Sequence, residues 1–224
     1  MPLSHTQQSA LVDAMRRYDF PCVTYDFVNR REKTHDSMKG VEMEIRGQLL
    51  ADRADGVRAG LANVLYWGYA RIGYRDHRVK QFQEQVTDQQ LVEARNLFRR
   101  LRGPGVCDIK RVGLPQFSGL SFVSKVRMFL DPCNYVVLDQ KLVKLRDQPI
   151  RTIFCDVTFP RWATSIPINK ANEEVYERWC QLCRRIASEY LQMSGSRAVD
   201  VERGIFQMVA GNNALCAAEI IATP

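Results

Sequence analysis

The stretch Gly113–Lys144, GLPQFSGLSFVSKVRMFLDPCNYVVLDQKLVK, organises the rest of the chain. A turn rich in Pro and Gly leads into a predicted helix that carries one lysine, Lys125. That helix is expected to stop at Asp131-Pro132, because proline disfavours helical backbone at the residue before it. A short apolar run then brings Asp139 to the start of the next predicted helix. We therefore expect the chemical centre of the protein here.

Lys125 lies at the edge of the apolar face of its predicted helix. The face itself is made by Phe122, Val126 and Phe129. Ser124 and Arg127 are expected to point away from it. Partial desolvation lowers the pKa of an amine, and this is what a nucleophilic lysine needs. The alternative is that the stem of Lys125 packs on the protein while its ammonium group stays in water.

Asp139 has two compatible explanations. It precedes QKLVKL, so it is a good N-cap for a helix, and capping alone accounts for it. It is also a candidate catalytic carboxylate. Upstream, the turn LPQFSG opens the Lys125 helix with Ser118, Gly119 and Ser121. Unpaired N–H groups at such a helix start can hold a phosphate, and Gly lets the ligand approach the backbone closely.

The composition bounds the protein class. The chain has 224 residues, 46% of them apolar, and a formal net charge of +7, which points modestly to a polyanionic partner. The seven cysteines are dispersed and odd in number, and no secretory signal precedes them, so we expect a reducing, cytoplasmic compartment. No apolar run is long enough for a membrane span.

The single CxxC, Cys180 with Cys183, falls in a predicted helix and has no second CxxC or His pair beside it. We expect core thiols there rather than metal ligands. The sequence thus predicts no metal and no cofactor.

Hydrophobic periodicity predicts about eight helices and little sheet, hence an all-α fold. Phe20–Val28 contains a Pro and is expected to be an extended connection outside any sheet, followed by a loop over 29–36. A long helix is expected from Gly56 to about Arg75. Thr87 and Gln90 form a capping-box pattern for the next helix, which should end near Gly103. Asn172 is a candidate cap for a later helix. The remaining predictions are helices over 5–18, 38–51 and 197–209, an irregular connection over 147–170, and a small-residue tail.

Two groups of aromatic residues deserve separate interpretations. Tyr66, Tyr69 and Tyr74 interleave with Arg71 and Arg75, a pattern that suits either base stacking or simple core packing. A flipped base would need flat apolar walls, and the candidates for these are Trp67, Phe159 and Trp162. For Trp67, packing in the core is the competing expectation.

The order of hairpin, lysine helix and apolar run ending in Asp139 resembles the helix-hairpin-helix DNA glycosylase superfamily, the group of endonuclease III and 8-oxoguanine glycosylase. The segment SKVRMFLDPCNYVVLDQKLV is most similar to compact, 8-oxoguanine-glycosylase-like microbial proteins. The resemblance covers roughly residues 56–145. Here the hairpin is longer than the usual LPGVG, with Ser121 in place of the second Gly, and no four-cysteine cluster follows, which argues against an iron–sulfur site.

This resemblance implies two helical lobes with a cleft between them, one formed by 1–54 plus 150–224 and the other by 55–149. It implies a monomeric DNA glycosylase with AP-lyase activity that flips a modified base out of double-stranded DNA, with Lys125 as nucleophile and Asp139 as its partner. Contacts to DNA would come from Ser118, Gly119, Ser121, Ser124 and Lys141.

Two other classes of function stay open on the sequence alone. One is a nucleic-acid-binding helix-hairpin-helix module without chemistry, in which Lys125 meets a phosphate. The other is an all-α interaction protein whose charge is incidental. Within the enzyme class, repair of oxidised guanine competes with removal of bulky modified bases from phage DNA.

Overall fold

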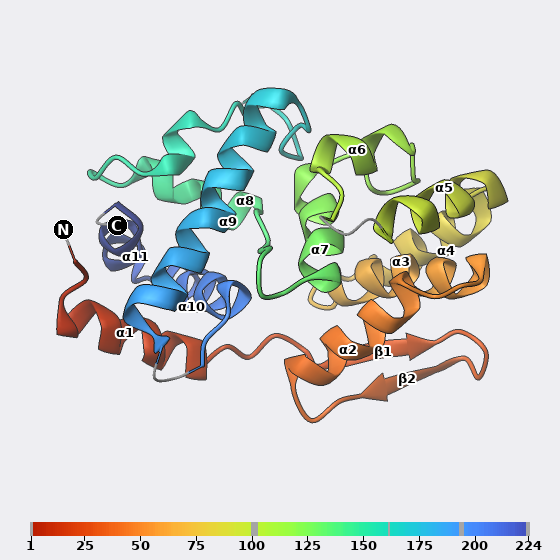
Figure 1. Cartoon of the computed structure of the whole chain (residues 1–224), viewed down its shortest axis with the longest axis horizontal. Coiled ribbons are helices and arrows are strands. Elements are labelled where there is room, and N and C mark those ends of the chain that lie inside the picture. Colours follow the sequence, from red (N-terminus) through yellow and green to blue (C-terminus); the bar gives the residue numbers. More distant parts are fainter. Residues whose placement is uncertain (1, 100–102, 161, 193–194, 223–224) are drawn as a thin grey trace. The chain divides into compact units, whose positions relative to one another are not determined.

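The computed structural model describes residues 2–99, 103–160, 162–192 and 195–222 (Figure 1). These residues are mostly helical, with one two-stranded sheet, so the expected predominantly helical class is confirmed. Residues 100–102, where the helix after Thr87 was expected to end, lie outside the described residues. Within the described ranges, no helix combines the length and the apolar character needed to cross a membrane.

The chain forms two compact units. The middle unit is Phe20–Asp131, and the terminal unit combines Met1–Asp19 with Pro132–Pro224. The predicted lobes had other boundaries, at 54/55 and 149/150. The reason lies in long-range hydrogen bonds: Asn63 ties the segment around Tyr25 into the middle unit, and Trp179 ties the segment around Val137 into the terminal unit.

The middle unit is built on two buried helices, α3 and α7. α3 is buried from Leu61 to Trp67 and α7 from Val123 to Leu130. Close packing of α2 on α3 depends on Gly60, where an added Cβ would lie 2.8 Å from the backbone nitrogen of Leu49. The elements in order are β1 (Val23–Asp26), β2 (Arg31–Thr34), α2 (Met38–Leu49), α3 (Ala54–Gly68), α4 (Arg75–Gln85), α5 (Asp88–Phe98), α6 (Val106–Arg111) and α7 (Leu120–Leu130).

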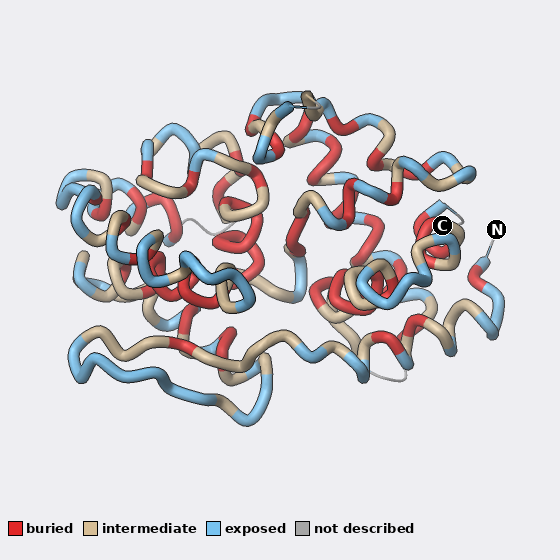
Figure 2. Tube along the Cα trace, turned by 180° about the vertical axis from the view of Figure 1, so that it is seen from behind, coloured by how far each residue is buried: buried red, intermediate tan, exposed pale blue. Residues whose placement is uncertain are grey.

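The hairpin β1–β2 corrects the expectation of an unpaired connection and a loop over 29–36. The strands pair antiparallel from Val23↔Thr34 to Asp26↔Arg31. The turn closes because the Asp26 carboxylate accepts hydrogen bonds from the backbone N–H groups of Val28 and Asn29, both at 3.0 Å. Pro21 lies before the first paired residue of β1, so the sheet does not need a hydrogen bond from its backbone nitrogen. β2 is exposed along its whole length (Figure 2).

The long helix predicted from Gly56 to Arg75 is also corrected. α3 ends at Gly68, and after a turn the chain forms α4, which the periodicity did not reveal. α4 is strongly polar and buries only Val79 and Phe82. Two apolar residues are too few to give a helical hydrophobic periodicity in the sequence. The capping box of Thr87 and Gln90 at the start of α5 is confirmed by reciprocal hydrogen bonds of 3.2 and 3.0 Å.

In the terminal unit, α1 packs along α10 (Figure 1). The two helices meet at Gly204, where an added Cβ would lie 2.7 Å from Leu11 Cδ1 and from Met15 Cγ. Its elements are α1 (His5–Arg16), α8 (Gln140–Val143), the 3-10 turns η1 (Lys144–Asp147) and η2 (Ile153–Asp156), α9 (Lys170–Tyr190), α10 (Ala198–Ala210) and α11 (Ala214–Ala222).

Three expectations for this unit can be compared with the structure. Asn169, not Asn172, caps α9 by accepting the N–H of Asn172 at 2.9 Å. Asn172 is buried instead and bonds both the N–H and the carbonyl of Thr158. The expected tail forms α11, because small and apolar residues pack it against α10. Cys180 and Cys183 are buried cysteines of α9 that form no disulfide, in line with the expected core position.

Candidate functional site

Lys125 is almost fully buried in α7, with only 7% of its surface exposed. Its Nζ donates a hydrogen bond to Ser121 Oγ at 3.0 Å and another to the Ser121 carbonyl at 3.2 Å. The same ammonium lies 4.9 Å from the centre of the Phe122 ring. The head group is therefore held by the preceding turn of its own helix, and the alternative with an ammonium in open water does not apply.

The stem of Lys125 packs against α3 at Gly68. An added Cβ there would lie 3.2 Å from Lys125 Cδ and 2.6 Å from Phe122 Cε1. Only a residue without a side chain leaves room for both groups at this point. Gly68 is thus part of the cradle that orients the lysine.

The N-terminus of α7 lies one turn before Lys125. Gly119 is its N-cap residue, and no side chain bonds the N–H groups of the first turn. Ser118 is exposed, while Gly119 and Ser121 are half-buried. Upstream, Gln116 has a positive φ of 69° and is held by Arg78 at 3.1 Å. No side chain caps this helix start, and binding of a phosphate there stays a prediction.

Two residues of α7 lie differently from the helical-wheel expectation. Ser124 has no exposed surface, and its hydroxyl donates to the Ser121 carbonyl at 3.1 Å. Arg127 is 3% exposed. Both were expected to point away from the apolar face of the helix. The wheel assumes one solvent-facing side, but α7 is buried on every side from Val123 to Leu130.

Asp139 is the N-cap of α8, as predicted. Its Oδ1 accepts hydrogen bonds from the backbone N–H groups of Lys141 at 2.9 Å and Leu142 at 3.2 Å. The residue is half-buried. Only Oδ1 takes part in these two capping bonds.

The place of Asp139 is set by α9. Tyr176 donates its hydroxyl to the Val136 carbonyl at 3.0 Å, and Trp179 donates Nε1 to the Val137 carbonyl at 3.0 Å. Both donors are fully buried. Because buried hydrogen bonds hold Val136 and Val137, three and two residues before Asp139, the backbone that leads to the carboxylate is fixed.

A cluster beside Asp139 was missed by the sequence analysis. Burial raises the pKa of the Tyr18 hydroxyl well above its ordinary value, and the carboxylates of Asp139 and Glu202 act in the same direction, opposed by Arg203. Arg203 lies 5.4 Å from the centre of the Tyr18 ring. No sequence pattern predicts that these residues are close together, since Tyr18 follows the first helix and Arg203 belongs to α10.

Lys141 and the predicted base-pocket residues have distinct environments. Lys141 is exposed, with its Nζ 4.8 Å from the Phe206 ring centre. Trp67 is 3% exposed and packs against Phe20 and Phe129 in the middle unit, with its Nε1 unpaired within the described residues. Both other candidates belong to the terminal unit: Phe159 is half-buried and Trp162 is 85% exposed.

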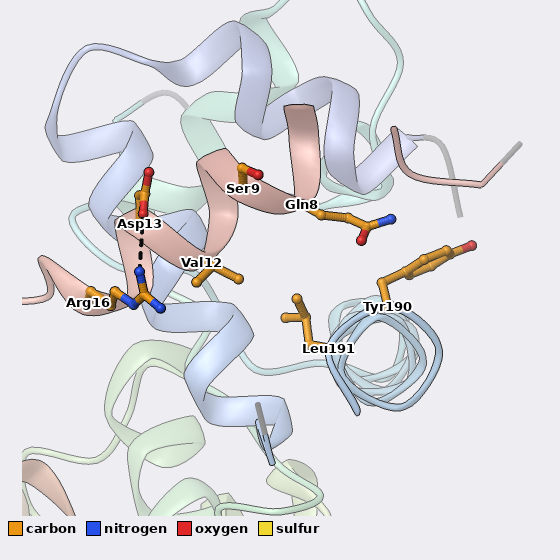
Figure 3. Close-up of a pocket in the computed structure, with 7 residues that line it drawn as sticks. All are labelled: Gln8, Ser9, Val12, Asp13, Arg16, Tyr190 and Leu191. Atoms are coloured by element: carbon orange, nitrogen blue, oxygen red, sulfur yellow. Dashed lines mark ion pairs between the residues drawn. The ribbon is translucent and has the colours of Figure 1, made fainter. Parts of the chain in front are cut away.

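A separate pocket of about 430 Å³ lies in the terminal unit, between α1 and the end of α9 (Figure 3). Val12 and Leu191 line it, and its charged groups, Asp13 and Arg16, pair with each other at 3.7 Å. None of the predicted site residues borders it. Across the described part of the chain, no group of three or more His, Cys, Asp or Glu side chains could hold a metal ion.

In comparisons with known proteins, no family model, no curated protein and no solved structure matches this chain.

Proposed function

We propose that the protein is a DNA glycosylase with AP-lyase activity, acting on a modified base in double-stranded DNA. The single observation that supports it most is the environment of Lys125. This lysine is nearly buried, and its ammonium group is bonded to Ser121. It lies one turn after the N-terminus of α7, where no side chain caps the helix. The net charge of +7 is compatible with a polyanionic substrate.

In the proposed reaction, the neutral amine of Lys125 attacks C1′ of a flipped nucleotide while the bond from C1′ to the base nitrogen breaks. The base leaves with the bonding electron pair and takes up a proton. We assign to Asp139 the role of the carboxylate that takes up a proton from the bound amine and passes it to the ring oxygen O4′ as the C1′–O4′ bond breaks, which leaves a Schiff base. Removal of a C2′ proton then expels the 3′ phosphate and nicks the strand.

The remaining residues have supporting roles in this proposal. Ser118, Gly119 and Ser121 present the N-terminus of α7 to a backbone phosphate. Exposed Lys141 adds a cation that contacts DNA. We leave Ser124 out of the DNA contacts, because its hydroxyl is buried and already bonded within α7. For the base pocket we keep Phe159 and Trp162 and assign Trp67 to the core.

Borohydride trapping tests the proposal. A panel of duplexes, each with one modified base, is incubated with the protein and reduced, and covalent protein–DNA adducts are separated by electrophoresis. At least one duplex should give an adduct, and Lys125→Gln should abolish it. Lys39→Gln is the matched control, since Lys39 is an exposed lysine of α2 in the same unit.

DNA binding by Lys125→Gln should persist, with a salt dependence reduced by about one unit at most. Binding without an adduct on any duplex would reject the enzyme in favour of a binding module. Full trapping by Lys125→Gln would reject the assignment of Lys125. The base that is released decides between repair of oxidised guanine and defence against modified phage DNA.

A further inference from the structure

A groove of about 670 Å³ lies in the middle unit, between the β1–β2 hairpin and helices α3 and α4. It is preformed, because Asn63 of α3 bonds the backbone of Tyr25 on both sides: it accepts the N–H at 2.7 Å and donates to the carbonyl at 3.1 Å. Neither Lys125 nor Asp139 lines it. Its volume is in the range typical of small-molecule sites, about 300–1,000 Å³.

One wall of the groove is aromatic. The Tyr25 ring lies 5.0 Å from Phe27 and 5.2 Å from Tyr66, centre to centre. Tyr66 is fixed, since its hydroxyl donates to Glu32 Oε2 at 2.6 Å and the Arg75 guanidinium lies 3.8 Å from its ring centre. Tyr25 and Phe27, in contrast, are half-buried. A flat ligand can stack on this part of the wall.

The cations around the groove differ in how strongly carboxylates bind them. Arg75 pairs with two carboxylates, Glu32 at 3.4 Å and Asp76 at 3.3 Å. Arg30 is exposed at the hairpin turn and makes no hydrogen bond or ion pair within the described residues. Lys80 is also exposed and has only a loose pair with Glu84 at 3.7 Å. The rim therefore offers cationic groups to an anion.

We propose that this groove binds a nucleotide, with the base stacked on Tyr25 and Phe27 and the phosphate bound by Arg30 and Lys80. Flat aromatic surface beside exposed cations matches a nucleobase that carries a phosphate. An uncharged ring would leave Arg30 and Lys80 without a role, and a bare phosphate would leave the aromatic wall unused. This inference does not depend on the chemistry of Lys125.

Calorimetric titration of the full chain tests the inference with four probes: deoxyadenosine 5′-monophosphate, deoxyadenosine, deoxyribose 5-phosphate and a ten-nucleotide single strand. The monophosphate or the strand should bind, and the tighter of the two identifies the physiological source. Removing the base or the phosphate should weaken binding about tenfold or more. Equal binding of deoxyribose 5-phosphate and the monophosphate would overturn the stacking, and equal binding of deoxyadenosine would overturn the phosphate site.

Variants locate the site. Phe27→Ala should weaken binding about tenfold, and Arg30→Gln should reduce the salt dependence of strand binding by about one unit. Arg31→Gln and Val28→Ala are matched controls, since both residues are exposed in the hairpin and do not line the groove. Unchanged binding by Arg30→Gln, whose side chain is exposed, would overturn the inference, as would an equal loss of binding by Arg31→Gln.

Two variants distinguish nucleotide binding in the groove from the proposed glycosylase activity. Lys125→Gln should lose the borohydride adduct and keep nucleotide binding in the groove. Arg30→Gln should give the opposite pattern, an intact adduct with weakened nucleotide binding.

Discussion

Lys125 and Ser121 lie one turn apart on α7 and are joined twice, because Nζ donates to both the hydroxyl and the carbonyl of Ser121 at 3.0 and 3.2 Å. The serine thus replaces the water that a buried ammonium would lose. At the same time it holds the amine at a fixed place near the start of the helix. If Lys125 is the nucleophile, these two hydrogen bonds set the position of its amine.

Ser121→Ala should slow borohydride trapping several-fold while the protein stays folded. The substitution removes the hydroxyl contact but keeps the carbonyl contact, so the amine loses orientation rather than its position. Ser121→Thr retains the hydroxyl and should restore most of the rate. Single-turnover trapping rates measure the effect, and an unchanged rate in Ser121→Ala would show that the hydroxyl does not orient the amine.

Gly68→Ala should destabilise the protein by about 1–3 kcal/mol, because a Cβ would press on Phe122 and on the stem of Lys125. Gly47→Ala is the matched change. Gly47 lies within α2 with nothing within 4 Å of an added Cβ, so alanine there should stabilise by about 0.4–1 kcal/mol. Urea unfolding of both variants provides the comparison. Equal effects of the two substitutions would contradict the close contact at Gly68.

Asp139→Asn should leave stability within about 0.5 kcal/mol of the parent, because Asn caps helices about as well as Asp. Asp139→Ala, which cannot cap, should cost about 1 kcal/mol. If the carboxylate serves the reaction, both variants should excise the base about 100-fold to 10,000-fold more slowly. Normal excision by Asp139→Asn would reduce Asp139 to a cap. Thermal melts and base-release assays separate the two roles.

The capping box of α10 should make stability depend on pH. Burial raises the pKa of Asp200, but hydrogen bonds from the side chain and backbone of Arg197 outweigh it and hold the pKa below its usual value. The ionised carboxylate therefore stabilises the fold above the unfolded pKa of about 4, and this contribution is lost as the pH falls through the lower folded pKa.

Asp200→Asn should accordingly lower the melting temperature at pH 7, by the equivalent of about 1 kcal/mol. The difference from the parent should shrink as the pH is lowered below about 4. Melting curves at pH 7 and pH 3 measure it. A difference that stays constant over this range would show that the charge of Asp200 does not contribute.

Features that depend on neighbours in the chain were predictable from the sequence. The capping box of Thr87 with Gln90, the end of α7 before Pro132 and the cap of α8 by Asp139 all follow from local hydrogen bonds and backbone sterics. The hydrogen bond of Lys125 to Ser121 is also local. It joins residues four apart on one helix, so the spacing alone could have revealed it.

Only the tertiary structure decided the features that depend on contacts distant in sequence. Asn63 binds the hairpin, Trp179 fixes the segment before Asp139, and Tyr18 lies in the same cluster as Arg203. Each contact joins segments that are far apart in the sequence, and no local residue pattern predicts which of them meet. The burial of α7 from Val123 to Leu130 has the same origin, because a helical wheel gives the relative angles of side chains but not how many sides other elements cover.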